Sequence, residues 1–358
     1  MDNQRLRRTQ MLLEKLKGKS IYLYGAGTRG KVALKNLNRL GMGENVVGFI
    51  DDNIKEGFYF GKPIHLTENI KQSDILEAVF IITTYAVNKM VCKIMEKGIS
   101  VDHIYYFSEL LIDDIDLEIL QNNRSEIEQT YRLLSDDLSK YIYKSLFEVY
   151  LDGNIGNLSR TKGDMQYFPI YGSSDEIKEF FLSEQEGFVD CGAYDGDTIR
   201  KFKAITQNKF QKIWAFEPDE DNYSKLTAYI EKEKDVRVEL VQGGVYSEDA
   251  VMYFDGKKGT SSSLKKTGEE SVKVYQLDNI INQTVSFIKM DIEGSEKDAL
   301  LGAKRIIAEY KPKLAICIYH QIEDFWKVPL LMKSLNPDYR LYIRNYEDRI
   351  DETVCYAI

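Results

Sequence analysis

The chain has 358 residues, of which 43% are hydrophobic and 29% charged, and its formal net charge is −9. This length favours two domains over one core, and the composition excludes collagen-like, low-complexity and wholly disordered classes. The negative balance argues against a general affinity for nucleic acid or anionic lipid. No apolar run approaches the roughly 20 residues that cross a bilayer, and the start lacks the apolar core of a signal peptide, so we expect a cytoplasmic protein without a membrane span.

The cysteines and two of the histidines have no pattern of their own that indicates chemistry. The four cysteines lie far apart in apolar or strand-like stretches, without a Cys-x-x-Cys pair, at Cys92, Cys191, Cys317 and Cys355. We interpret them as buried free thiols rather than as metal ligands or disulfides. His65 and His103 are interpreted as structural or surface residues.

From Ser20 the sequence alternates apolar runs with helical patterns, through IYLY, KVALKNLNRL, VVGFIDD, AVFIITT and HIYYF. This order predicts a parallel, Rossmann-like α/β sheet in a first domain, residues 1–111. Residues 112–163 are an acidic stretch with apolar residues recurring every three or four positions, which predicts a helical connector. The cluster DGNIGNLSRTKGD then breaks the helix before a third region, residues 164–358.

The third region predicts seven strands, in the order FVDCGA, KIWAFEP, VRVELVQGG, VSFIKMD, KLAICIY, RLYIRNY and TVCYAI. Helices are expected between the earlier strands, with KDALLGAKRIIAEY as one helix and another from about Pro329 to Leu335. The last two strands are joined without a helix and must therefore be antiparallel. Residues 250–277 predict a hairpin over one end of the sheet.

The strongest chemical motif is FVDCGAYDGDT at residues 188–198. An apolar strand ends in Asp190, Gly192 and Gly196 flank a turn, and Thr198 opens a helix. Glycine lets the backbone approach a ligand closely, and the helix amides would face the strand ends. Glu217 ends the next strand, where its carboxylate could accept from both hydroxyls of a ribose. Together these features predict a nucleoside-binding site at the carboxyl ends of the strands.

With IWAFEPD, FIKMDIEGSEKDALLGA and AICIYHQIEDFW, this motif resembles the FkbM family of S-adenosylmethionine-dependent methyltransferases, from about Asp164 onward. The resemblance implies a seven-stranded class I methyltransferase sheet, which agrees with the strand count. It implies that Asp190, Gly192 and Gly196 border the methionyl part of the cofactor and that Glu217 holds its ribose. The expected S-adenosylmethionine site is completed by Ala193, Asp195, Thr198 and Asp291.

Catalytic candidates follow the fourth and fifth strands. Asp291 and Glu293 of DIEGSE should point to the cofactor edge, near the sulfonium or the acceptor hydroxyl, and whether a metal binds there stays open. Glu296 is expected to be solvated or a capping-box partner. His320 is a candidate general base for a hydroxyl, with a hydrogen-bonded structural histidine as the alternative. The family often has a histidine where Asn345 stands, which favours His320 for that role.

The first domain carries GAGTRG, with Gly25, Gly27 and Gly30 after a strand, and Asp51 ends the next strand. This context predicts a second nucleotide site. The run VVGFIDDNIKEGFYFGKPI also resembles the N-terminal domain of sugar-processing acyltransferases, which implies a nucleotide-sugar. A dinucleotide such as NAD and a degenerate docking domain remain alternatives.

One further loop could contact substrate. The segment GTSSSL at residues 259–264, with Lys257 and Lys258, could contact a glycan or a phosphate, or could be only a flexible loop.

These features favour an enzyme that transfers a methyl group from S-adenosylmethionine to a hydroxyl of a sugar, nucleotide-sugar or glycan, in polysaccharide or glycoconjugate biosynthesis. A second hypothesis is an NAD-dependent sugar oxidoreductase or epimerase, although no Tyr-x-x-x-Lys pair follows the first domain at the expected spacing. A third is a non-catalytic binding protein in a glycan-assembly complex. The sequence leaves the oligomeric state open.

Overall fold

The computed structural model describes residues 13–54, 57–71, 75, 77–84, 87–106, 117–159, 161–254, 264–265, 270–347 and 349–358. The chain packs into two compact units. One unit is formed by the chain up to Arg124, by Tyr141–Lys162 and by Glu347–Ile350; the other is formed by Ser125–Lys140, Gly163–Tyr346 and Asp351–Ile358. Among the described helices, none combines the length and the apolar content needed to cross a bilayer.

The first unit is built on a six-stranded sheet with the order β3-β4-β2-β1-β5-β6. Its strands are β1 (Ile21–Tyr24), β2 (Val46–Ile50), β3 (Gly57–Tyr59), β4 (Lys62–His65), β5 (Val79–Ile82) and β6 (Ile104–Tyr106). All neighbours pair in parallel except the hairpin of β3 and β4, which the sequence pattern did not predict. The helices α2 (Thr28–Arg39) and α4 (Val87–Glu96) belong to this unit. Helix α2 is amphipathic and buries Ala33, Leu34 and Leu37.

In the described part of the predicted helical stretch, the chain forms four separate helices, α5 (Leu117–Asn122), α6 (Arg124–Leu133), α7 (Asp137–Asp152) and α8 (Gly156–Ser159). Asp136 precedes α7, and its Oδ1 accepts a hydrogen bond from the backbone amide of Ser139 at 2.7 Å. A carboxylate in this position satisfies an amide that has no partner within the helix, so the sequence encodes a helix start inside the acidic stretch.

The second unit contains a seven-stranded sheet with the order β16-β17-β15-β14-β7-β8-β9, as the sequence predicted in number. Its strands are β7 (Gly187–Cys191), β8 (Lys212–Glu217), β9 (Val238–Gln242), β14 (Phe287–Met290), β15 (Lys313–Cys317), β16 (Leu341–Asn345) and β17 (Thr353–Ala357). The first five are mutually parallel, and β17 is antiparallel to both of its neighbours, as expected for its short connection to β16. The predicted α/β class is therefore confirmed.

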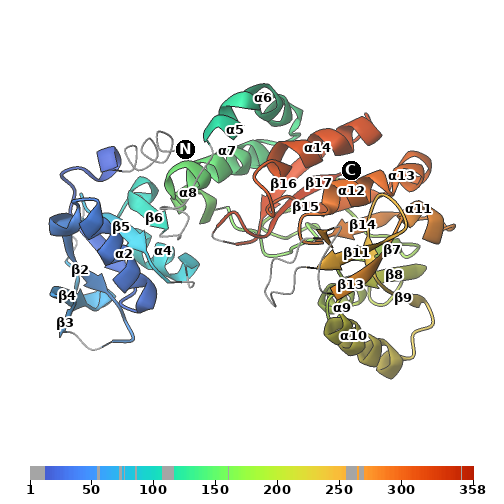
Figure 1. Cartoon of the computed structure of the whole chain (residues 1–358), viewed down its shortest axis with the longest axis horizontal. Coiled ribbons are helices and arrows are strands. Elements are labelled where there is room, and N and C mark those ends of the chain that lie inside the picture. Colours follow the sequence, from blue (N-terminus) through green and yellow to red (C-terminus); the bar gives the residue numbers. More distant parts are fainter. Residues whose placement is uncertain are drawn as a thin grey trace. The chain divides into compact units, whose positions relative to one another are not determined.

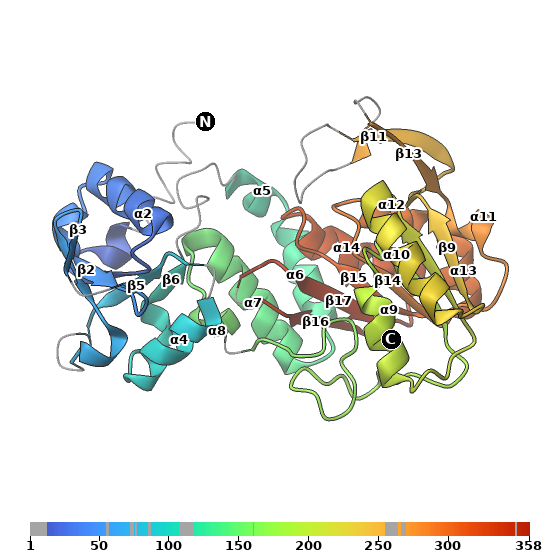
Figure 2. The same ribbon diagram turned by 90° about the horizontal axis from the view of Figure 1, so that it is seen from below.

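Helices cover both faces of this sheet. Figure 1 shows α12, α13 and α14 on one side, and α9 and α10 on the other, and Figure 2 shows the latter pair from below. Their bounds are α9 (Asp197–Ile205), α10 (Glu220–Glu233), α11 (Leu277–Ile280), α12 (Glu296–Leu301), α13 (Lys304–Tyr310) and α14 (Asp324–Leu335). A three-layer arrangement of this kind explains why the central strands are apolar on both faces.

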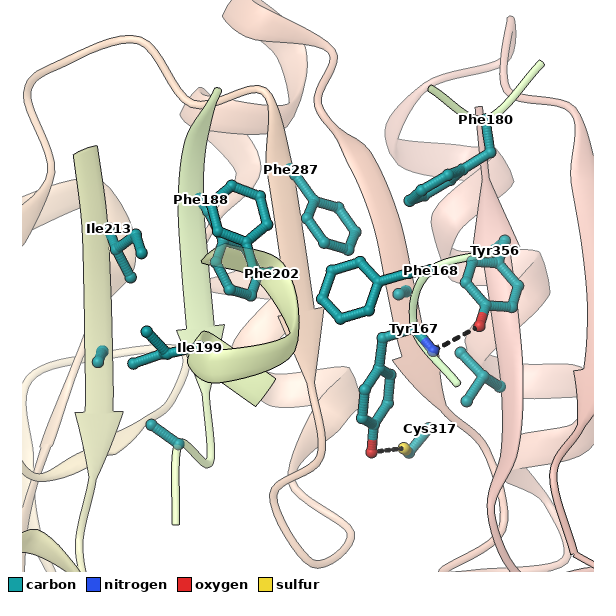
Figure 3. Packing of buried hydrophobic residues seen from close by; sticks show 14 of the residues in the cluster. Tyr167, Phe168, Phe180, Phe188, Ile199, Phe202, Ile213, Phe287, Cys317 and Tyr356 are labelled. Carbon is teal, nitrogen blue, oxygen red and sulfur yellow. Dashed lines mark hydrogen bonds between the residues drawn. The ribbon is translucent and has the colours of Figure 1, made fainter. Parts of the chain in front are cut away.

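The core beneath α9 is aromatic. Phe188 of β7 stacks on Phe202 of α9 and on Phe287 of β14, with ring centroids 4.7 and 4.9 Å apart, and Phe168 packs beside them (Figure 3). The backbone amide of Tyr167 donates to the hydroxyl of Tyr356 at 3.0 Å. The segment before β7 is thereby fixed against the sheet, with Tyr167 on the same face as the phenylalanines.

The predicted hairpin is confirmed. Strands β11 (Ala250–Phe254) and β13 (Glu270–Tyr275) pair antiparallel and form a four-stranded sheet with β10 (Gly244–Val245) and β12 (Leu264–Lys265). In the loop that could contact a glycan or phosphate or be only flexible, Lys257, Lys258 and residues 259–263 lie outside the described residues.

Two helix predictions were wrong. The helix expected from Pro329 begins at Asp324, because the burial of Phe325, Trp326 and Val328 outweighs the lost backbone hydrogen bond at an internal proline. The single helix expected after β14 is broken at Gly302, between α12 and α13. A Cβ at Gly302 would lie 2.1 Å from the carbonyl oxygen of Tyr246, so the chain needs glycine at this close approach.

Candidate active site

The strand order of the second unit reverses between β7 and β14. The chain proceeds outward from β7 to β8 and β9, and then returns to add β14 and β15 on the other side. Ligands bind in the crevice at the carboxyl ends of the strands at such a reversal. Asp190, Glu217, Asp291 and His320 all lie at or just beyond the ends of these parallel strands. The predicted site residues of this unit therefore share one sheet edge.

The turn after β7 has the predicted strand-turn-helix form. The amides of Gly192 and Ala193 both donate to the carbonyl of Phe216, at 3.0 Å each. Gly192 has φ +80°, and a Cβ there would lie 2.0 Å from the carbonyl oxygen of Asp291. Gly196, with φ +89°, precedes α9, whose first turn contains buried Thr198. The two strand ends thus approach so closely that a side chain at Gly192 has no room.

Asp195 faces away from this tight approach. Its carboxylate pairs with Arg200 at 2.6 Å and is about one third exposed. It lies in the turn between β7 and α9 and is partly exposed there.

Glu217 is buried at the end of β8. Its Oε2 accepts from the amide of Tyr194 at 2.8 Å, and its Oε1 accepts from the amide of Asp219 at 3.0 Å. Burial raises the pKa of Glu217 to about 7, although these two hydrogen bonds oppose the shift. Each oxygen keeps a free lone pair, so the carboxylate is held in place with spare acceptor capacity.

Lys289 is a site residue that the sequence reasoning missed. It lies opposite Asp190 in the pairing of β14 with β7, and its Nζ is 3.1 Å from Asp190 Oδ1. The same ammonium donates to the carbonyl of Gly192 at 2.7 Å. Burial alone would lower the pKa of Lys289, but the charges of Asp190 and Asp291 raise it. The signal was present in the sequence, because a lysine in the apolar strand FIKM needs a buried partner.

Asp190 is fully buried, and this burial raises its pKa against the opposing charge of Lys289. In the described structure neither of its oxygens has a partner in hydrogen-bonding geometry, despite the short distance to Lys289. Asp190 therefore has the charge of Lys289 beside it but no well-aligned donor, which leaves its lone pairs available to a donor from a ligand.

Two tyrosines hold Asp291. The hydroxyl of Tyr167 donates to Oδ2 at 2.8 Å, and the hydroxyl of Tyr319 donates to Oδ1 at 3.1 Å. Burial alone would raise the pKa of Asp291, but Lys289, His320 and the two hydroxyls lower it. Asp291 is therefore a carboxylate kept ionised. Neither tyrosine was predicted, since Tyr167 lies 124 positions before Asp291 and only the fold brings them together.

His320 lies among three carboxylates. Its Nδ1 is 3.2 Å from Glu296 Oε1, and its Nε2 is 3.5 Å from Asp291 Oδ1 and 3.7 Å from Glu293 Oε2. Burial alone would lower the pKa of His320, but these charges raise it to about 9. The neutral imidazole expected of a general base near pH 7 is thus not the state that the surrounding carboxylates favour.

Glu296 is not solvated, which corrects that part of the expectation. Its side chain is buried, and its Oε1 accepts from the amides of Ile292 at 2.9 Å and Gly294 at 3.4 Å. It therefore closes the DIEGSE turn on itself, which resembles the return hydrogen bond of a capping box. Asn345, in contrast, is a buried strand residue that donates to Thr353 Oγ1 at 3.0 Å.

In the first unit the glycine turn and Asp51 come together. Asp51 Oδ2 accepts from the amide of Ala26 at 2.8 Å. Gly25 has φ +119°, and a Cβ at Gly30 would lie 2.1 Å from the carbonyl oxygen of Gly25. Gly27 precedes α2 with open space beside it. Gly25, Gly27 and Asp51 lie just beyond the carboxyl ends of β1 and β2, and Gly30 lies in the first turn of α2.

Comparison with known proteins agrees with this geometry. Residues 190–350 match the family model of the methyltransferase FkbM domain. The crystal structure of methyltransferase FkbM from Methylobacillus flagellatus KT is similar over 100% of this chain and 99% of that chain, with 22% identity and a TM-score of 0.65. An rRNA methylase from Streptococcus thermophilus has 16% identity over 49% of this chain and 86% of its own, with a TM-score of 0.31. No curated protein matches.

The structural likeness at 22% identity shows the fold. The family match begins at the end of β7 and covers the whole of β14, and it includes Asp190, Glu217, Asp291 and His320. Residues 190–350 of this chain therefore match the methyltransferase FkbM domain, and the chain is an S-adenosylmethionine-dependent methyltransferase.

Proposed function

We propose that this enzyme methylates a hydroxyl of a sugar, nucleotide-sugar or glycan in polysaccharide or glycoconjugate biosynthesis. The observation that carries the proposal is the shared sheet edge, where the glycine turn after β7 and Glu217 at the end of β8 lie on the same edge as the cluster of Asp291, Glu293 and His320. Such a density of carboxylate, imidazole and phenol groups suits a polyhydroxylated acceptor, because each sugar hydroxyl needs a hydrogen-bond partner.

The residues present fit S-adenosylmethionine. Glu217 has two oxygens with lone pairs to spare for the ribose hydroxyls, and Asp190 has unsatisfied buried oxygens beside the cofactor turn, with Gly192, Ala193, Asp195, Gly196 and Thr198 forming that turn. The cofactor supplies an electrophilic methyl group on a sulfonium. The chain contributes alignment, by holding the acceptor oxygen in line with that methyl group in a site closed to water.

The acceptor hydroxyl must lose a proton as its oxygen forms the new bond to carbon. Asp291, Glu293 and His320 lie within reach of one another on this edge. The side chain of Glu293 is 45% exposed, whereas that of His320 is 10% exposed and both Asp291 oxygens already accept from tyrosines. We therefore assign to Glu293 the role of accepting the proton of the acceptor hydroxyl, and to Asp291 and His320 a positioning role.

The test is calorimetry with S-adenosylhomocysteine on the wild type, on Glu217→Gln and on the exposed neighbour Glu220→Gln. We expect Glu217→Gln to weaken binding by at least tenfold, because one carboxylate oxygen becomes a donor, and Glu220→Gln to bind as the wild type does. Equal affinities for all three would remove the ribose assignment. Transfer of labelled methyl groups to a panel of sugars and nucleotide-sugars then tests the acceptor class, and turnover only with non-hydroxyl acceptors would contradict it.

A second binding function is favoured by the first unit. The glycine turn of Gly25, Gly27 and Gly30 together with Asp51 supports a site for a nucleotide-sugar or a dinucleotide. Fluorescence titration with NADH, in parallel with calorimetry on nucleotide-sugars, distinguishes these ligands. Binding of NADH without binding of S-adenosylmethionine would favour an oxidoreductase or epimerase instead, and binding of neither ligand to the first unit would favour a docking domain.

A further inference from the structure

A second feature of the sheet edge is a cluster of potential metal ligands beside Glu293. Asp291, Glu296 and His320 each offer one ligand atom, and these atoms lie within 4.8 Å of one another. They come from the ends of two neighbouring strands, with Asp291 and Glu296 in the DIEGSE turn after β14 and His320 after β15.

Atoms of this cluster lack partners although they are buried. In the described part of the chain, three atoms of the cluster have no partner in hydrogen-bonding geometry. They are the two ring nitrogens of His320 and Oε2 of Glu296. His320 is 10% exposed and Glu296 is 1% exposed. Buried polar atoms without a partner are uncommon in proteins, and each calls for a ligand or an ion.

The carboxylates are held by groups behind them, as metal ligands are. Tyr167 and Tyr319 donate to the two oxygens of Asp291, and the amides of Ile292 and Gly294 donate to Oε1 of Glu296. Such outer hydrogen bonds orient ligand carboxylates and are typical of built metal sites. Here they fix two acidic side chains beside an imidazole without neutralising them.

The local charge also favours a cation. The negative charges of Asp291, Glu296 and Glu352 raise the pKa of Glu293, which His320 opposes. Lys289 is the cation beside Asp291, but it is already committed to Asp190 and to the carbonyl of Gly192. Closely spaced buried carboxylates repel one another unless a cation lies between them. A protonated His320 supplies one positive charge at this place, and a divalent ion bound to its imidazole would supply two.

We infer that Asp291, Glu296 and His320 bind a divalent first-row transition-metal ion such as Mn²⁺ or Zn²⁺. One imidazole and two carboxylates suit these ions better than Ca²⁺ or Mg²⁺, which prefer oxygen ligands throughout. The 3.5 Å between His320 Nε2 and Asp291 Oδ1 lets both atoms reach one ion at about 2.1 Å. Glu293, 3.7 Å from the same nitrogen, borders the position left for a further ligand.

The consequence for catalysis rests on the proposed function. An acceptor hydroxyl that fills the remaining position would be oriented by the metal, and its proton would leave more readily, next to Glu293. Metal binding itself requires neither acceptor nor cofactor, so it is tested independently.

The experiment uses the full chain after treatment with a chelator, titrated with MnCl₂ by calorimetry and by electron paramagnetic resonance. We expect one ion per chain, with echo modulation from a directly bound imidazole nitrogen. His320→Gln should abolish that modulation and weaken binding by at least tenfold, and Asp291→Asn should weaken it similarly. His65→Gln, in the other unit, is the matched control and should bind as the wild type does.

Tyr319→Phe provides a variant that removes only an orienting hydroxyl, and its Mn²⁺ affinity should fall about tenfold. Circular dichroism and S-adenosylhomocysteine binding are measured on every variant, so that a loss of metal is separated from a loss of fold or of cofactor. Absence of saturable binding by the wild type to both MnCl₂ and ZnCl₂, or unchanged affinity in His320→Gln, would overturn the inference and leave the methyltransferase assignment intact.

Discussion

At the scale of single residues, a buried ammonium organises the cofactor edge. Lys289 joins the carboxylate of Asp190 to the carbonyl of Gly192, so one side chain ties β14 to the turn after β7. Removing one partner of a buried ion pair leaves the other charge uncompensated in a medium that cannot solvate it. The pair therefore matters less for the attraction that it supplies than for the penalty that follows when it is broken.

The first prediction concerns this pair. Lys289→Met should lower the free energy of unfolding by about 3–5 kcal/mol, because Asp190 is left buried and unpaired. Lys311→Met is the control, since Lys311 pairs with Asp338 on the surface, with side chains 57% and 79% exposed, and should cost about 0–1 kcal/mol. Urea unfolding measures both. Similar losses in the two variants would contradict the structural role of Lys289.

The second prediction uses Glu217, whose pKa rises to about 7 on burial, above the value of 4.5 for the free side chain. The folded state then holds its proton more tightly than the unfolded state, so this residue costs stability as the pH rises from about 4.5 to 7. The free energy of unfolding of the wild type, relative to Glu217→Gln, should fall by about 2–3 kcal/mol across that interval. If urea titrations at pH 4.5–7.5 showed the same pH dependence of the free energy of unfolding for the wild type and Glu217→Gln, they would contradict the raised pKa of Glu217.

Residue identities were predictable where a strand end dictated position. Asp190, Glu217, Asp291 and His320 follow apolar runs, and parallel strands bring their carboxyl ends to one edge, so their proximity followed from the pattern. Tyr167 was not predictable, because it reaches Asp291 from a segment that precedes the sheet. The ionisation state of His320 also depended on Glu296, whose burial the sequence did not reveal.

At the scale of elements, the third prediction concerns the turn after β7. Gly192→Ala adds a Cβ 2.0 Å from the carbonyl oxygen of Asp291 at φ +80°, which must separate β7 from β14 and abolish S-adenosylhomocysteine binding. Gly172→Ala is the matched control, with φ +87° and nothing within 4 Å of its Cβ. It should lose only about 1–2 kcal/mol of stability, from backbone strain. Calorimetric binding by Gly192→Ala at wild-type affinity would refute the close approach.

Element boundaries were less predictable than element order. The last helix was expected to begin at about Pro329, but buried side chains before and after this proline continue α14 back to Asp324. The break at Gly302 depends on Tyr246, which lies 56 positions earlier, so no local pattern marks it. In both places contacts from distant parts of the chain decided the boundary.

At the scale of the whole molecule, the fourth prediction separates the ligands of the two units. Hydrogen exchange with S-adenosylhomocysteine should slow in residues 190–198 and 217–219, where the proposed cofactor contacts lie, and stay unchanged in residues 24–30. A ligand of the first unit should instead slow exchange in residues 24–30 and 50–53, which surround the hydrogen bond from the amide of Ala26 to the carboxylate of Asp51. Protection of residues 24–30 by S-adenosylhomocysteine would contradict this division.

The position of β17 in its sheet bears on how the protein is made. Strand β17, residues 353–357, lies between β15 and β16 in the sheet, although it follows both of them along the chain. While a ribosome synthesises the protein, β15 and β16 therefore emerge with open hydrogen-bonding edges, the kind of surface that recruits other strands and chaperones. Nascent chains arrested before Thr353 should stay protease-sensitive across β15 and β16, and should become resistant once the inserted strand has been released.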